Sequence, residues 1–300
     1  MLARIANKAI ALYGFPREYV CCSPAALEGL TKWFLDDRPI DPSALVMLGY
    51  RPLVLGADPS VTDRPHSLEL HIGERTIARM VIEPTWSTVG GHPGIFLGTA
   101  PWQAFLPWPL HQLDRGRQWL NSHRKGNITS GNKAYDLLRI GYAQPREVQL
   151  AVVGGPADCN VFPTDLHGDL GANNYRISLR SAGMACSQVQ ERGTFILCRI
   201  PLDQAGLAYT LGPRHMAEPA PMTEILPWQG EHAGHGLPMG TLSVIHCSVK
   251  GHVDIGAHRI FHCDTSERRT LAEGVPLAQV HVAILAALRR AGIHIPVVLP

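Results

Sequence analysis

The chain has 300 residues and a formal net charge of +2, and its lysines and arginines form no block. The length allows one large domain or two ordinary ones, and the small charge argues against nucleic acid or an anionic membrane surface as the main partner. No stretch approaches the roughly 20 apolar residues that a membrane span needs. The seven cysteines show no Cys-x-x-Cys spacing and no signal peptide opens the chain, so we expect reduced thiols in a cytoplasmic protein.

Residues 1–120 are expected to form a small α+β unit whose role the sequence does not indicate. Ser23 as N-cap and Pro24 at the first position predict a helix over Ala25–Leu35. Three further segments are typical of strands, and the turn Gly73-Glu74-Arg75 joins the last two as a hairpin. These segments are Arg51–Leu55, Ser67–Ile72 and Thr76–Ile82.

Helices are expected at Leu113–Leu120 and Ala134–Ile140, and residues 121–140 are predicted to be a helical linker. No internal repeat is evident. Residues 141–300 are strand-rich and end in an apolar helix, Val280–Arg290, which Gly292 stops. Several strands with few helices indicate a small barrel closed by helices, so the expected class is α+β. The expected strands are Val148–Val153, Tyr175–Leu179, Thr194–Arg199, Leu242–Val249 and Arg259–Cys263.

The strand Tyr175–Leu179 and the residues just after it carry a candidate anion site. Alternation with a period of two places Arg176, Ser178 and Arg180 on one face, and Ser181 follows directly. Guanidinium groups beside hydroxyls suit a phosphate, because arginine presents a fork of donors to anionic oxygens. The alternative interpretation is an edge strand with a solvated, charged face.

Four motifs follow one another in this half of the chain. Pro145-Arg146-Glu-Val148 precedes the first expected strand, and a polar loop, Asn160–Gly168, follows that strand. Next come Ile177-Ser-Leu-Arg180-Ser181, a short predicted helix over Met184–Glu191, and Gly193-Thr-Phe195. The last motif is Cys247 on a strand, followed by Val253-Asp-Ile-Gly256-Ala-His258-Arg-Ile-Phe261. Together these motifs resemble those of the flavin reductase-like family of FMN-binding split β-barrels, over residues 140–265.

The resemblance implies a C-terminal FMN-binding split β-barrel with flanking helices, in which NADH or NADPH reduces the flavin by hydride transfer to N5. It places His258 at the exposed face of the flavin, as the candidate catalytic residue. It also implies a homodimer, because family members build the flavin site at the subunit interface. The cofactor-binding residues that it implies are Asn160, Val161, Phe162, Pro163, Thr164 and Asp165 for the ring and ribityl chain, and Ser178, Arg180 and Ser181 for the phosphate.

The chain departs from the family pattern at four positions. Ala257 stands where the family has an aspartate, Ala185 and Gln188 replace phosphate-contacting residues, and Asp165 occupies a position expected to hold a hydroxyl. Two alternatives to a flavin reductase acting on a small-molecule substrate or electron acceptor therefore stay open. One is a flavin-binding carrier or sensor without turnover. The other is a barrel that has lost flavin and serves as a dimerisation scaffold.

A metal site is the other chemistry that the C-terminal half invites, because histidines and cysteines gather there. Zinc needs three or four converging ligands, and neighbours on a strand such as His246 and Cys247 point to opposite faces. His258 and His262 do share a face, but two residues do not make a site. We therefore predict no metal. The gathered residues are His232, His235, His246, Cys247, His258, His262 and Cys263.

Overall fold

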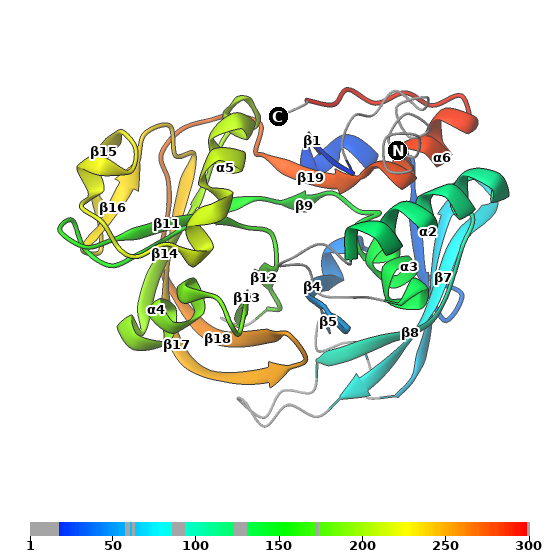
Figure 1. Ribbon diagram of the computed structural model, residues 1–300, viewed down its shortest axis with the longest axis horizontal. Helices are drawn as coiled ribbons and strands as arrows, with labels where there is room; N and C mark the ends of the chain where they lie inside the picture. The colour runs from blue at the N-terminus through cyan, green and yellow to red at the C-terminus, as the bar shows by residue number, and fades with distance from the viewer. Residues whose placement is uncertain are drawn as a thin grey trace.

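The architecture rests on two seven-stranded antiparallel sheets, one in each half of the chain, in a computed structural model that describes residues 18–57, 61, 64–85, 94–122, 131–171 and 174–298. Figure 1 shows the two sheets side by side, meeting near β4, β5, β12 and β13. The N-terminal sheet comprises β2 (Lys32–Leu35), β3 (Arg38–Ile40), β4 (Leu45–Tyr50), β5 (Leu53–Ala57), β6 (His66–Ile72), β7 (Arg75–Thr85) and β8 (Ile95–Gln103). The C-terminal sheet comprises β10 (Gln149–Val153), β11 (Asn160–Thr164), β12 (His167–Asp169), β13 (Tyr175–Arg180), β14 (Thr194–Arg199), β17 (Ser243–Ile255) and β18 (His258–Thr270).

The two sheets have the same strand order. The N-terminal sheet runs β3-β2-β6-β7-β8-β5-β4, and the C-terminal sheet runs β11-β10-β14-β17-β18-β13-β12. When the strands of each sheet are counted along the chain, both orders read two, one, five, six, seven, four, three. Both sheets are antiparallel at every pairing. The fold therefore contains a repeated topology that the sequence does not display.

The connections between equivalent strands distinguish the two sheets. A tight turn at Gly73 joins β6 to β7, whereas the corresponding connection from β14 to β17 is a long excursion. That excursion carries α5 (Ala205–Leu211) and a hairpin of β15 (Trp228–His232) and β16 (His235–Pro238). Helix α4 (Met184–Arg192) lies between β13 and β14 and covers one face of the C-terminal sheet through Ala185, Cys186 and Val189.

A third, small sheet ties the ends of the chain together. Strand β19 (Ala278–His281) pairs with β1 (Tyr19–Cys22) on one side and β9 (Arg146–Glu147) on the other. Helix α6 (Val282–Arg290) follows β19 and packs into the core of the N-terminal sheet, where Ile284 is fully buried. The C-terminal helix therefore completes the core of the N-terminal half.

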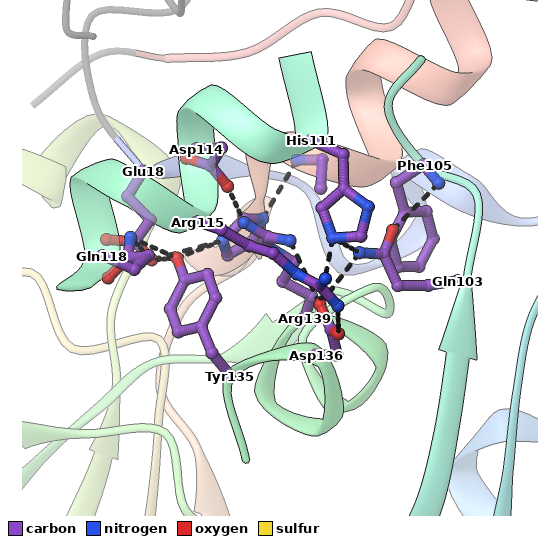
Figure 2. Close-up of polar contacts among 12 residues, drawn as sticks. Glu18, Gln103, Phe105, His111, Asp114, Arg115, Gln118, Tyr135, Asp136 and Arg139 are labelled. Atoms are coloured by element: carbon purple, nitrogen blue, oxygen red, sulfur yellow. Dashed lines mark hydrogen bonds and ion pairs between the residues drawn. The ribbon is translucent and has the colours of Figure 1, made fainter. Parts of the chain in front are cut away.

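Helices α2 (Trp108–Ser122) and α3 (Asn132–Gly141) are joined by a buried ionic network (Figure 2). The Arg139 guanidinium, with no exposed side-chain surface, lies between the carboxylates of Asp114 and Asp136. Asp136 also accepts from Arg115 Nη2 at 2.8 Å and from Gln103 Nε2 at 3.0 Å. Burial lowers the pKa of Arg139 to about 10, which leaves it charged at neutral pH. The network is charge-compensated and fastens the helix pair to the end of β8.

The structure confirms most of the predicted elements and corrects two. The predicted helix Ala25–Leu35 is wrong: a 3-10 turn over Pro24–Leu27 ends before Gly29, which has φ +71°, and Lys32–Leu35 then pairs with β6. The predicted Ser23 cap is confirmed, since its hydroxyl accepts from Ala25 N at 3.3 Å. The predicted polar loop Asn160–Gly168 is also wrong, because Asn160–Thr164 pairs with β10 as strand β11, and His167 and Gly168 belong to β12, which pairs with β13.

The predicted strand Thr194–Arg199 is present with its predicted bounds, and the remaining predicted strands and helices of both halves are present with shifted ends. The predicted linker, residues 121–140, ends in α3, and its residues 123–130 lie outside the described residues. The division of the chain into 1–120, 121–140 and 141–300 stays a prediction. Among the helices that the structure describes, none combines the length and apolar character needed to cross a membrane.

Candidate functional site

A pocket of about 220 Å³ opens where the C-terminal sheet meets the β4–β5 hairpin. Its walls come from the end of β11, from β13, from the start of α4 and from the start of β18. Tyr50, the last residue of β4, closes it from the N-terminal half. The lining residues are Tyr50, Phe162, Pro163, Thr164, Asp165, Leu166, Ser178, Leu179, Arg180, Gly183, Ala185, His215 and His258. We call this the site pocket.

His258 is the most unusual titratable group of the site pocket. Its side chain is 1% exposed, and burial together with the positive charges of Arg180 and Arg51 lowers its pKa to about 4. The imidazole is therefore neutral at physiological pH. Its Nδ1 lies 3.3 Å from the hydroxyl oxygen of Ser178, while its Nε2 is buried with no hydrogen-bond partner among the residues that the structure describes. An unsatisfied buried nitrogen costs free energy, so this atom is suited to meet a ligand.

Tyr50 contacts two polar side chains of the site pocket, those of Arg180 and His258. Its ring lies edge-on to His258, with a centroid distance of 4.5 Å, and its hydroxyl oxygen accepts from Arg180 Nε at 2.6 Å. The guanidiniums of Arg180 and Arg51 both lie within 6 Å of the ring centroid, a range in which cation–π attraction acts. The hydrogen bond to Tyr50 thus fixes the position of the Arg180 guanidinium at the pocket wall.

The start of α4 supplies a second feature that favours an anion. Its N-cap is Gly183, which has no side chain to satisfy the first amide groups of the helix, and both Gly183 and Ala185 line the pocket. The N-terminus of a helix carries a partial positive charge and free N–H donors, so it binds anions. Arg180 and His215 lie beside this helix start, since an added Cβ at Gly183 would stand 3.1 Å and 3.5 Å from their carbonyl oxygens.

Six of the nine predicted cofactor-binding residues line the site pocket, as does the predicted catalytic residue His258. The cofactor candidates are Phe162, Pro163, Thr164, Asp165, Ser178 and Arg180. Val161 is instead fully buried in the core on the other face of the sheet. Ser181 is exposed outside the pocket lining, and its backbone N donates to Ala257 O at 3.1 Å.

Asn160 is held inside the protein. It is fully buried, and its Nδ2 donates to Gln188 Oε1 at 2.8 Å and to the carbonyl of Arg214 at 2.9 Å. Gln188 Nε2 in turn donates to the carbonyl of Ala217. Asn160 and Gln188 thus fasten β11 and α4 to the turn that carries His215. Asn160 and Gln188 therefore hold together the elements that form the pocket wall without lining the pocket themselves.

Asp165 lines the site pocket, but its carboxylate is engaged elsewhere. Its Oδ2 accepts from Gln279 Nε2 at 2.5 Å. Burial and the negative charge of Asp165 raise the pKa of the Tyr142 phenol, and a hydrogen bond that this hydroxyl donates to Asp165 adds to the effect. Because the carboxylate is directed at β19, its charge is partly satisfied there. The repulsion that this carboxylate would exert on an anionic ligand is thereby reduced.

Arg176 shares the face of β13 with Ser178 and Arg180 but lies outside the pocket lining. It is 1% exposed, and its Nε donates to Asn174 Oδ1 at 3.0 Å. Sequence reasoning missed Tyr50 and His215, which come from distant segments and belong to no motif. Within the ranges that the structure describes, no three His, Cys, Asp or Glu side chains are placed to hold a metal ion.

The residues present fit a ligand that combines an anionic group with an aromatic or apolar part. Arg180 and the start of α4 provide the positively charged side, while Phe162, Leu179 and the Tyr50 ring provide the apolar side. The unpartnered His258 Nε2 offers one polar contact between them. The pocket is smaller than the roughly 300–1,000 Å³ typical of sites that enclose a whole ligand. A ligand as large as a flavin nucleotide would therefore extend out of it.

No family model matches the chain, and no curated protein matches it. Solved structures do. The chain is similar to the flavin reductase PheA2 (13% identity, TM-score 0.43), covering 51% of this chain and 95% of that one. It is similar to the NADH:FAD oxidoreductase SgcE6 of Streptomyces globisporus (14%, 0.43), covering 59% and 99%. It is also similar to BorF, the flavin reductase component of a bacterial two-component tryptophan halogenase (16%, 0.45), covering 56% and 99%.

These solved structures are of the class that the sequence resemblance named. The expected fold class is an α+β protein with a C-terminal split β-barrel and flanking helices. The sheets and helices described above confirm it.

Proposed function

We propose that the chain binds a flavin nucleotide, FMN, at the site pocket and acts as a flavin reductase-type oxidoreductase. Bound flavin would supply hydride chemistry, with NADH or NADPH as the donor and a small-molecule acceptor. The observation that carries the proposal is that a positively charged corner, formed by Arg180 and the start of α4, lines the same pocket as the apolar side chains of Phe162 and Leu179.

The residues of the chain have distinct roles in this proposal. Arg180 and the first amides of α4 hold the phosphate, because both present donors to anionic oxygens. Thr164 and the backbone around it contact the ribityl chain and ring. His258, neutral at physiological pH, offers Nε2 as a hydrogen-bonding group to the ring and cannot act as a cationic acid there.

Flavin binding without turnover is the second candidate, and the neutrality of His258 favours it. A histidine whose pKa is about 4 is almost entirely in its neutral form at pH 7 and is therefore a poor general acid. A carrier or sensor needs binding and orientation, which the site pocket offers, and needs no acid. The homodimer and the cytoplasmic location stay predictions.

The binding proposal is tested by the Arg180→Ala substitution. Removing the guanidinium takes away a charge-assisted contact, so FMN affinity should fall by about 1.5–3 kcal/mol, about tenfold to a hundredfold in Kd. Quenching of FMN fluorescence on titration with the protein measures the affinity. Arg192→Ala is the matched control, because Arg192 ends the same helix that the pocket meets and pairs only with the exposed Asp158. Equal affinity in the two variants would place the phosphate elsewhere.

Anaerobic addition of NADH or NADPH to the FMN-loaded protein separates the two candidate functions. Bleaching of the flavin bands at a rate well above that of free FMN supports the reductase. A bound flavin that neither nucleotide bleaches supports the carrier or sensor. A wild-type protein that takes up no FMN contradicts both and leaves the scaffold alternative.

A further inference from the structure

The two sheets meet through equivalent strands. β4 is the third strand of the N-terminal sheet and β12 is the third strand of the C-terminal sheet, and each lies at the edge of its sheet. At Gly168 of β12, an added Cβ would stand 2.5 Å from a methyl of Val46 on β4. At Gly56 of β5, it would stand 2.8 Å from a methyl of Leu170, which follows β12. The third strands of the two sheets thus lie against each other, and the neighbouring strand β5 takes part in the contact.

An apolar cluster fills this contact and draws on both halves. Val46, Leu48, Val54 and Ile95 come from the N-terminal sheet, while Leu170 and Ile260 come from the C-terminal half, and all are buried. A backbone hydrogen bond from Ala257 N to Arg51 O, at 2.9 Å, joins the β17–β18 turn to the β4–β5 hairpin. Gly256 permits that approach, because a Cβ there would lie 2.1 Å from Arg51 O. The contact has the composition of a protein core.

The site pocket lies at the edge of this contact. Among the described residues, Tyr50 is the one lining residue that comes from the N-terminal half, and it contacts both Arg180 and His258. Without Tyr50, the Arg180 guanidinium loses its 2.6 Å acceptor and His258 loses its ring contact. The N-terminal half therefore forms part of the wall and fixes the orientation of a pocket residue.

We propose that the N-terminal sheet serves as a built-in second unit that completes the site pocket within one chain, and that Tyr50 is its ligand-positioning residue. The identity of the ligand rests on the proposed function. In this arrangement the chain pairs two units of the same topology internally. A second copy is then not required to complete the pocket. Tyr50 acts by holding Arg180 toward the anionic group of the ligand and by covering His258.

Tyr50→Phe and Tyr50→Ala test the positioning role by FMN titration. Tyr50→Phe keeps the ring beside His258 but removes the acceptor of Arg180, and we expect FMN to bind about fivefold to tenfold more weakly. Tyr50→Ala removes both contacts and should weaken binding further. Phe34→Ala is the matched control, since Phe34 forms a similar ring pair with His71, at 4.6 Å, on a different strand of the same sheet. Unfolding curves for each variant show whether the fold is kept.

A mixing experiment tests whether the pocket is completed within one chain. Tyr50→Ala and Arg180→Ala chains are unfolded together, refolded and titrated with FMN. If each pocket is built within one chain, the mixture contains no native pocket and binds as weakly as the separate variants. Recovery of a fraction with wild-type affinity would show that the N-terminal half acts on another chain and would overturn the proposal.

The outcomes for the two proposals are distinguishable. A wild-type protein that binds no FMN overturns the proposed function, and with it the role of Tyr50 toward that ligand. A wild-type protein that binds FMN, with a Tyr50→Ala variant of equal affinity, overturns the positioning role and leaves the proposed function standing. Weaker binding in Tyr50→Phe and Tyr50→Ala, with Phe34→Ala unchanged, supports the proposal.

Discussion

At the scale of single residues, the site pocket depends on a histidine that the fold keeps neutral. His258 stands between two guanidiniums, those of Arg180 and Arg51, and is almost fully buried. Both burial and neighbouring positive charge disfavour the imidazolium. The same two charges that repel a proton would attract an anionic ligand. The two guanidiniums thus both keep His258 neutral and favour an anionic ligand.

This pattern predicts how stability depends on pH. The unfolded chain protonates His258 near pH 6.5, while the folded protein does so only near pH 4. The stability that comes from the neutral histidine is therefore complete above pH 6.5 and is lost as the pH falls toward 4. Between pH 7.5 and pH 4.5, the wild type should lose about 2–3 kcal/mol more than a His258→Gln variant, measured by urea unfolding. Parallel losses in both proteins would contradict the shifted pKa.

The residue types along the chain predict which segments form the site, but they do not predict which way each side chain points. Thr164, Ser178 and Arg180 were predicted from motif and alternation, and all three line the pocket. Asn160 has equally suitable chemistry, yet its amide is used by Gln188 and the Arg214 carbonyl. The direction of a polar side chain depends on partners that are distant in sequence. These distant partners cannot be identified from a single sequence, so the side-chain directions could not be predicted.

At the scale of elements, β11 shows why a strand can be mistaken for a loop. Pro163 and the polar residues around it are typical of turns. The strand lies at the edge of the C-terminal sheet, where only one side needs hydrogen-bond partners. A proline is tolerated at such an edge, since its missing N–H costs no ladder bond. Tertiary contacts also explain why Lys32–Leu35 is a strand and not the end of the predicted helix, because Trp33 is buried in the N-terminal core.

The helix pair α2–α3 carries a prediction of its own. Arg139→Ala leaves the buried carboxylates of Asp114 and Asp136 without their shared cation, and breaking a buried ion pair costs about 3–5 kcal/mol. Arg115→Ala, which removes a half-buried partner of Asp136, should cost about 1 kcal/mol or less. Urea unfolding of both variants at pH 7 measures the difference. Similar losses for the two arginines would show that burial of Arg139 contributes nothing extra.

At the scale of the whole molecule, the repeated topology is hidden from sequence by divergence in its connections and surfaces. The turn at Gly73 and the excursion with α5 join equivalent strands, so the two halves differ in spacing. Equivalent strands also face different surroundings: β13 exposes Arg180 to the pocket, whereas β5 buries Val54 in the contact between the halves. Side chains follow these local demands while the strand order is kept.

The path of the chain makes the two halves depend on each other. Helix α6 follows the C-terminal sheet but lies in the core of the N-terminal sheet, and β19 pairs with β1 and β9. Opening the N-terminal core therefore exposes α6 and strains the small sheet that holds the start of the C-terminal half. The two sheets should unfold together.

Ile284→Ala tests this coupling, because Ile284 is fully buried on α6. The loss of a buried isoleucine costs about 2–5 kcal/mol. Hydrogen exchange should then accelerate equally in peptides from β6, in the N-terminal sheet, and from β17, in the C-terminal sheet, because one cooperative unit opens as a whole. Val189→Ala on α4, in the core of the C-terminal sheet, is the reciprocal control and should accelerate the same two peptides. If exchange becomes faster only in the sheet whose core carries the substitution, the two sheets unfold independently and the prediction is wrong.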